Sequence, residues 1–145
     1  FNGAREVCGF TPAAAQTVRR LKARGYRVAL ATNPIFPHVA TEHRIRWAGL
    51  TPEDFEIYTT YETSTFCKPN PAYYLEVARS LGVTPEECLM VGNDANEDMA
   101  ARTLGMDVFL LTDCLINTKN RDISVYPQGD FAALNAYLDR LNSEK

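Results

Sequence analysis

The 145-residue sequence predicts an α/β fold, a Rossmann-like, doubly wound parallel sheet with helices on both faces. The first observation is a set of short apolar runs bounded by turn residues, which is typical of strands buried on both faces. These runs are residues 26–32, 55–60, 88–91 and 107–111. The second observation is that helix signals separate the runs. Such alternation indicates parallel strands joined by right-handed crossovers.

Capping residues mark where the helices begin and end. A polar residue followed by proline suits the N-cap and first position of a helix. It occurs at Thr11-Pro12, Asn70-Pro71 and Thr84-Pro85. Thr51-Pro52 opens a shorter turn in the same way. A glycine follows each helical stretch, as expected of a C-terminal cap, at Gly25, Gly49, Gly82 and Gly105. We expect a long irregular stretch over 112–129 and a last helix over 130–141 with Phe131, Leu134, Leu138 and Leu141 on its apolar face.

The composition is that of an ordinary globular protein, with 46% hydrophobic and 23% charged residues, so we expect residues 1–145 to form one domain. A net charge of −3 offers no basic surface for nucleic acid. No apolar run is long enough to cross a membrane. The cysteines are scattered and form no CxxC pair, which favours a reducing, cytoplasmic setting. No pattern in the sequence indicates an oligomeric state.

An acidic pair follows the third apolar run, at the edge of a parallel sheet where ligands bind. The run continues through Gly92 and Asn93 to Asp94, and a helix is expected to open at Ala95. Asp94 and Asp98 would then share one face of that helix. Two adjacent carboxylates suit Mg²⁺, which keeps several waters and takes few protein carboxylates. The alternative is that Asp94 only caps the helix and Asp98 faces water.

Two other segments could bind an anion. Thr32 and Asn33 follow the first apolar run, where a hydroxyl and backbone N–H groups can hold a phosphate oxygen. The Asn-Pro sequence there also suits an ordinary turn. Lys68 lies just before the helix that begins at Pro71, where the helix dipole disfavours a cation. We therefore expect Lys68 to point at an anionic ligand, the alternative being a solvated loop lysine.

Several other chemistries find less support. The sequence has no GxxxxGK[ST] and no GxGxxG, so it is not read as a Walker-type NTPase or a dinucleotide-binding protein. His38 and His43 are expected to be packed or surface residues, and no Ser–His–Asp arrangement follows from the spacings.

In their order along the chain, these motifs resemble those of the haloacid dehalogenase-like (HAD) hydrolase superfamily, in its phosphatase-like branch. The family's second motif is an apolar strand ending in Thr or Ser, here LAT up to Thr32. Its third motif is a lysine at the start of a helix, here Lys68 in CKPNP. Its fourth motif is an acidic pair after a strand, here VGNDANED. The match covers about residues 11–115.

The resemblance implies a Mg²⁺-dependent phosphatase that acts on a small phosphorylated metabolite through an aspartyl-phosphate intermediate. Thr32, helped by the Asn33 N–H, would hydrogen-bond the transferring phosphoryl group. Lys68 would neutralise the phosphate and the nucleophile together. Dehalogenation is less favoured, because an acidic metal pair has no role in a metal-free reaction.

For the metal, the resemblance implies that Asp94 and Asp98 bind Mg²⁺ directly or through water. The family has Asp directly after the glycine of this motif, whereas this chain has Asn93 there. The ligand position therefore falls either to Asp94, which we favour, or to Asn93 with Asp94 orienting it.

The family's first motif, DxDx[TV], does not occur in these 145 residues. The chain resembles the family with its N-terminal strand and cap removed, and a start at Phe1 agrees with this. In the family the strand lies between those ending here at Thr32 and Val91, and its loss would leave an open apolar slot. We expect one of three outcomes: the strand exists in a segment outside these residues, another strand fills the slot, or the isolated fragment is unstable. The fragment by itself is expected to be inactive. The alternative functions are a non-catalytic phosphate- or Mg²⁺-binding pseudoenzyme and an α/β interaction module.

Overall fold

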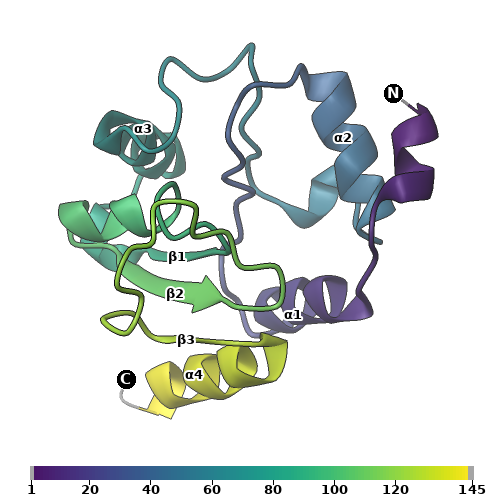
Figure 1. Ribbon diagram of the computed structural model, residues 1–145. Helices are drawn as coiled ribbons and strands as arrows, with labels where there is room; N and C mark the ends of the chain where they lie inside the picture. Colours follow the sequence, from purple (N-terminus) through teal and green to yellow (C-terminus); the bar gives the residue numbers. More distant parts are fainter. Residues whose placement is uncertain (1, 144–145) are drawn as a thin grey trace. The chain divides into compact units, whose positions relative to one another are not determined.

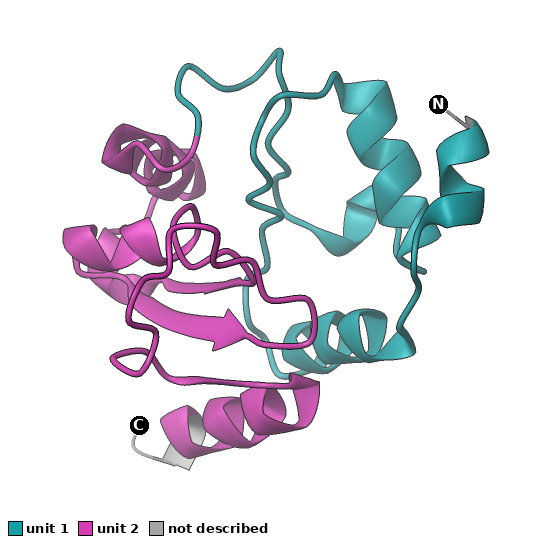
Figure 2. Ribbon diagram, in the orientation of Figure 1, with its two compact units in different colours: residues 1–67 teal, residues 68–145 magenta. Residues whose placement is uncertain are grey.

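The computed structural model describes residues 2–143, and Figure 1 shows the arrangement of their helices and strands. The chain divides into two compact units, Phe1–Cys67 and Lys68–Lys145 (Figure 2). Each unit is described by itself, and one domain over residues 1–145 stays a prediction.

The first unit consists mainly of helices. Its elements are η1 (Asn2–Val7), α1 (Pro12–Ala23), α2 (His38–Trp47) and η2 (Pro52–Asp54). As predicted, the Thr11 hydroxyl caps α1 by accepting a hydrogen bond from the Ala13 N–H. Gly25 and Gly49 follow the two α-helices with φ of 83° and 78°, left-handed conformations that glycine adopts without strain.

The first two predicted strands are much shorter than expected. Residues 26–32 and 55–60 run alongside each other as extended segments joined by one isolated parallel bridge, between Leu30 and Tyr58. The Thr59 N–H donates to the Leu30 carbonyl and the Leu30 N–H donates to Ile57, both at 3.0 Å. The parallel direction is therefore confirmed, and the predicted length is wrong because few ladder hydrogen bonds form. A small core supports the pair, in which Ala15, Ile45 and Leu50 are buried and Val18, Leu30, Phe55 and Tyr58 pack against them.

The second unit holds a parallel sheet in the order β1-β2-β3. Its elements are α3 (Pro71–Leu81), η3 (Pro85–Glu87), β1 (Leu89–Gly92), η4 (Met99–Leu104), β2 (Asp107–Leu111), β3 (Gln128–Gly129) and α4 (Phe131–Ser143). Leu89 pairs with Asp107 and Leu110 with Gln128. η4 packs against β1 and β2, α3 packs against η4, and α4 packs against β2 and β3. β1 is thus an edge strand of the described sheet. Its carboxyl end leads into residues 93–98, which contain Asp94 and Asp98 and are called the acidic motif below.

Four details of the second unit differ from the sequence prediction or refine it. The helix expected at Ala95 is a turn followed by the 3₁₀ helix η4. The helix expected at Thr84-Pro85 is only the short η3. The stretch expected to be irregular ends in the two-residue strand β3. The last helix begins at Phe131, with the Asp130 carboxylate accepting a hydrogen bond from the Ala133 N–H, and Leu134 and Leu138 are buried as predicted.

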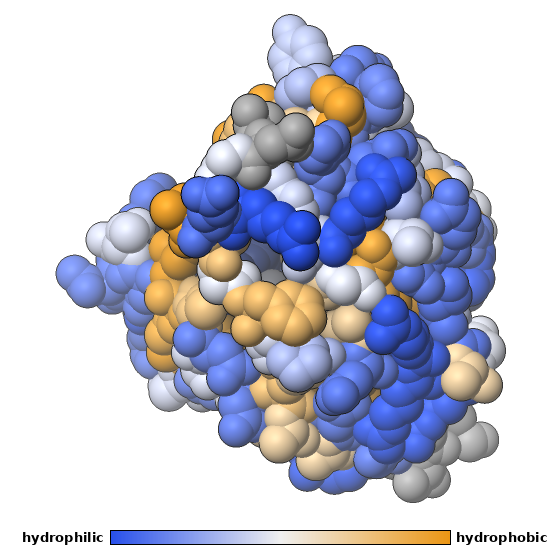
Figure 3. Space-filling model, turned by 90° about the vertical axis from the view of Figure 1, so that its right-hand side faces the viewer, coloured by the Kyte–Doolittle hydropathy of each residue, from blue (hydrophilic) through white to orange (hydrophobic). Residues whose placement is uncertain are grey.

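Polar residues dominate the part of the surface that Figure 3 presents, with hydrophobic side chains between them in smaller groups. Within residues 2–143, no helix combines the length and apolar character needed to cross a membrane.

Candidate active site

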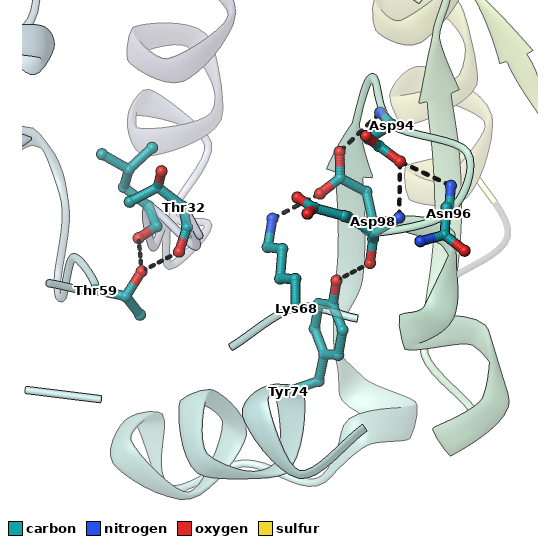
Figure 4. Close-up of polar contacts among 9 residues, drawn as sticks. Thr32, Thr59, Lys68, Tyr74, Asp94, Asn96 and Asp98 are labelled. Carbon is teal, nitrogen blue, oxygen red and sulfur yellow. Dashed lines mark hydrogen bonds and ion pairs between the residues drawn. The ribbon is translucent and has the colours of Figure 1, made fainter. Parts of the chain in front are cut away.

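A buried ion pair lies at the centre of the candidate site in the second unit. The Lys68 ammonium donates to Asp98 Oδ1 at 2.6 Å, and the two side chains are only 5% and 8% exposed (Figure 4). Lys68 lies just before α3, and Asp98 lies just before η4. The alternatives of a solvated lysine and a water-facing Asp98 are therefore wrong. Burying two charges costs free energy even when they are paired, which suggests that the pair serves more than stability.

The acidic motif folds back on itself after β1. Asp98 Oδ2 accepts a hydrogen bond from the Asp94 N–H at 2.9 Å, so each carboxylate oxygen of Asp98 has a protein donor. This approach requires glycine at position 92. A Cβ built there would lie 2.1 Å from Asp98 Oδ2 and 2.3 Å from Cγ, well inside van der Waals contact. Gly92 was not among the predicted site residues, although a glycine at the end of a strand can signal close approach of a neighbouring group.

The carboxylate of Asp94 has one oxygen committed to the turn. Its Oδ1 accepts the N–H groups of Asn96 and Glu97, both at 2.8 Å, which are the two N–H groups that an N-cap side chain binds at the start of a helical turn. Asp94 therefore acts as a cap, as the alternative interpretation held. Its second oxygen, Oδ2, makes no hydrogen bond to protein within residues 2–143. That oxygen is available to a cation.

The described residues offer Mg²⁺ only a small set of oxygen ligands. Among the described residues, no cluster of three or more His, Cys, Asp or Glu side chains could hold a metal ion. Mg²⁺ needs only one or two carboxylates when water and substrate phosphate complete its shell. The chemistry of Asp94 therefore fits Mg²⁺. Each oxygen of Asp98 accepts one hydrogen bond, from Lys68 or from the Asp94 N–H, and the role of Asp98 as a metal ligand stays a prediction.

Asn93 connects the acidic motif to the loop that follows β2. Its side-chain Nδ2 donates to the Cys114 carbonyl at 2.6 Å, and its own carbonyl accepts the Ile116 N–H at 2.8 Å. A parallel bridge between Asp94 and Ile116 continues this pairing. The Asn93 amide N–H₂ thus has a structural role, and the choice between Asn93 and Asp94 as a metal ligand stays a prediction.

Two tyrosines of α3, absent from the sequence prediction, surround the ion pair. The Lys68 ammonium lies 5.8 Å from the centroid of the Tyr73 ring, within the range of a cation–π interaction. The Tyr74 hydroxyl donates a hydrogen bond to the Glu97 carbonyl (Figure 4). Burial, reinforced by the nearby charge of Asp98, raises the pKa of Tyr74. A Tyr-Tyr pair directly after a helix start was the available signal, but such a pair more often indicates only a packed core.

Thr32 and Asn33 belong to the first unit. The Thr32 carbonyl accepts a 2.7 Å hydrogen bond from the Thr59 hydroxyl, and the Asn33 carbonyl accepts the Ile35 N–H at 2.9 Å. Two hydrogen bonds therefore hold this segment in place. One comes from Thr59 in the neighbouring extended run, and the other closes a tight turn at Asn33. Their role in phosphate binding alongside Lys68 stays a prediction.

The two histidines make local contacts in the first unit. The exposed His38 has its backbone N–H 3.0 Å from a Glu62 carboxylate oxygen, and its Nδ1 lies 3.5 Å from that carboxylate. His43 makes an edge contact with Trp47, with ring centroids 6.3 Å apart. These contacts agree with surface and packing roles.

Comparison with known proteins identifies the family to which the sequence is similar. The family model for haloacid dehalogenase-like hydrolases matches residues 5–105. The chain is 31% identical to the phosphoglycolate phosphatase of Colwellia psychrerythraea, covering 81% of this chain and 50% of that protein. It is 33% identical to the glyceraldehyde 3-phosphate phosphatase of Methanothermobacter thermautotrophicus, covering 69% of this chain and 43% of that protein.

The fold comparison agrees. The structure of a HAD phosphatase from Thermococcus onnurineus superposes with a TM-score of 0.70 at 23% identity, over 88% of this chain and 57% of that one. The chain spans about half the length of the curated relatives it matches. On this evidence of sequence and fold, the chain belongs to the haloacid dehalogenase-like hydrolases.

Proposed function

We propose that this chain forms the Mg²⁺- and phosphate-binding part of a phosphatase that acts on a small phosphorylated metabolite. The observation that carries the proposal is the buried Lys68–Asp98 pair, which the hydrogen bond from the Asp94 N–H to Asp98 Oδ2 joins to Asp94. A buried ammonium and a carboxylate oxygen that makes no hydrogen bond to protein within residues 2–143 provide opposite charges next to one strand end. A phosphate dianion with its Mg²⁺ needs this combination of charges.

The reaction follows from the family chemistry. A carboxylate outside these 145 residues would attack phosphorus, the bond to the leaving oxygen would break, and the alcohol would depart with a proton. Water would then hydrolyse the aspartyl-phosphate and release inorganic phosphate. In this scheme Lys68 neutralises charge that develops on the phosphoryl oxygens, and Asp98 holds the ammonium in place. Thr32 and the Asn33 N–H are proposed to bind a phosphoryl oxygen, as the family's second motif implies.

The metal would bind through Asp94, with Asn93 as the alternative ligand. When bound, Mg²⁺ supplies charge neutralisation at the phosphate oxygens. Asp98 would bind the metal directly or through water while its oxygens also accept from Lys68 and the Asp94 N–H. The proposal includes the cytoplasm as location, which the free cysteines in the described part of the chain support.

One observation favours a second candidate function. Because DxDx[TV] is absent from these residues, a non-catalytic module that binds phosphate and Mg²⁺ would show the same site. The sequence upstream of Phe1 in the full reading frame separates the two functions. An apolar run ending in DxDx[TV] favours the enzyme, and a start codon beside Phe1 favours the binding module.

The direct test is phosphate release by the full-length protein from small phosphomonoesters, with Mg²⁺ and with a chelator. We expect release with Mg²⁺ and loss of release with the chelator. Asp94→Asn should raise the half-saturating Mg²⁺ concentration tenfold or more, since it weakens a charged oxygen ligand. Asp107→Asn is the matched control, because it removes an exposed carboxylate at the amino end of β2, opposite the strand ends that lead into the site, and it should change nothing. Equal Mg²⁺ dependence in the two variants would exclude Asp94 as a ligand.

A further inference from the structure

We propose that Tyr74 is a positioning residue, whose hydroxyl fixes the peptide that carries Asp98 and so sets the geometry of the acidic motif. This inference rests on the proposed function, since it names a group that acts on the phosphate site through other residues. Tyr74 lies on α3, the helix that Lys68 precedes, and its hydroxyl reaches the turn after β1.

The peptide unit between Glu97 and Asp98 is held at both of its polar groups. Its carbonyl accepts the Tyr74 hydroxyl, and its N–H donates to the Asp94 carbonyl at 3.0 Å. The preceding N–H, that of Glu97, is bound by the Asp94 carboxylate. Without the phenol, the carbonyl would lose the donor that fixes the plane of this peptide. The direction in which Asp98 leaves the backbone depends on that plane.

The position of the phenol is itself tightly determined. Tyr74 is 1% exposed, and its ring meets that of Tyr73 edge-on, with centroids 5.0 Å apart and planes at 84°. Tyr73 in turn contacts the Lys68 ammonium. The Tyr73 ring thus links Lys68 to α3, and the Tyr74 hydroxyl links the peptide before Asp98 to the same helix. α3 can therefore hold Lys68 and Asp98 in one geometry.

The chemistry of the hydroxyl agrees with a purely structural donor. Burial raises the pKa of Tyr74, so the phenol keeps its proton at neutral pH and donates it to the Glu97 carbonyl. A phenolate could not make this bond, because it has no proton to donate. Tyr74 is accordingly a hydrogen-bond donor here.

The test is Tyr74→Phe in the full-length protein, which removes one oxygen and keeps the ring. We expect hydrogen exchange at the Glu97 and Asp98 amides to accelerate about tenfold. We also expect kcat to fall and the half-saturating Mg²⁺ concentration to rise by about tenfold or more, as for other partners that orient a ligand. Replacing Tyr74 by 4-aminophenylalanine, which restores a donor at the same place, should recover most of each loss.

The matched control is Tyr58→Phe. It also removes a phenol hydrogen bond, the 2.8 Å bond from Tyr58 to Glu42 in the first unit. It should lower the melting temperature without changing exchange at Glu97 and Asp98 or the Mg²⁺ requirement. Exchange at these amides within twofold of wild type in Tyr74→Phe, or no rescue by 4-aminophenylalanine, would overturn the inference. A wild type without phosphatase activity would instead refute the proposed function, and the exchange experiment would still decide the role of Tyr74.

Discussion

Lys68→Ala is expected to lower kcat of the full-length enzyme by a hundredfold or more. Losing one charge-stabilising donor from a site that excludes water costs about 3 kcal/mol of transition-state stabilisation. The same change leaves Asp98 as a buried carboxylate without its cation, and the free energy of unfolding should fall by about 3–5 kcal/mol. Denaturant unfolding and steady-state kinetics below the melting transition measure the two effects separately.

Lys22→Ala provides the matched control for Lys68. It also removes an ion pair, between Lys22 and Asp54 at 3.1 Å, but the lysine side chain there is 39% exposed. We expect a loss below about 1 kcal/mol and unchanged kcat, since solvent screens such pairs. The double variant Lys68→Met/Asp98→Asn, which keeps an acceptor for the Asp94 N–H, should regain part of the stability without regaining activity. A loss of kcat under fivefold in Lys68→Ala would remove the lysine from the proposed chemistry.

Gly92→Ala is the second large effect that the structure predicts. The new Cβ would lie 2.1 Å from Asp98 Oδ2, and this carboxylate cannot easily move because Lys68 and the Asp94 N–H hold it. Relieving the clash should cost about 1–3 kcal/mol of stability. The displaced ion pair should reduce kcat by about a hundredfold, as misplacements near 1 Å do in other enzymes. Unfolding curves and kcat of the purified variant are the measurements.

Gly9→Ala is the control for Gly92. A Cβ at position 9 would meet no atom within 4 Å, so neither stability nor kcat should change. Wild-type kcat in Gly92→Ala would mean that the approach of Asp98 to the strand end has no consequence for the reaction.

Much of the site could be predicted because helix caps and strand ends leave clear signals in sequence. Asn70 caps α3 as expected, accepting the Ala72 N–H at 2.9 Å, and this fixes where Lys68 enters the second unit. The approach of Asp98 to Asp94 was also anticipated, but for a reason that proved wrong. The segment after Asp94 is a turn and not the expected helix, although the Asp94 carboxylate binds two N–H groups as an N-cap does.

Other features could not be predicted, because they depend on contacts between distant segments. Nothing in the sequence indicates that the Tyr74 hydroxyl donates to the Glu97 carbonyl, or that the Asn93 amide donates to the Cys114 carbonyl. The strands of the first unit were overestimated because β-branched composition reports burial better than it reports the number of ladder hydrogen bonds. The central strand that the family places between the ends at Thr32 and Val91 stays a prediction.

The central claim is that Lys68 and Asp94 bind one phosphate together with its Mg²⁺. Calorimetric titration of the full-length protein with inorganic phosphate, with and without Mg²⁺, tests it most directly. We predict that Mg²⁺ tightens phosphate binding tenfold or more, that phosphate tightens Mg²⁺ binding by the same factor, and that Asp94→Asn abolishes this coupling. Phosphate and Mg²⁺ affinities that are independent of each other would contradict the account.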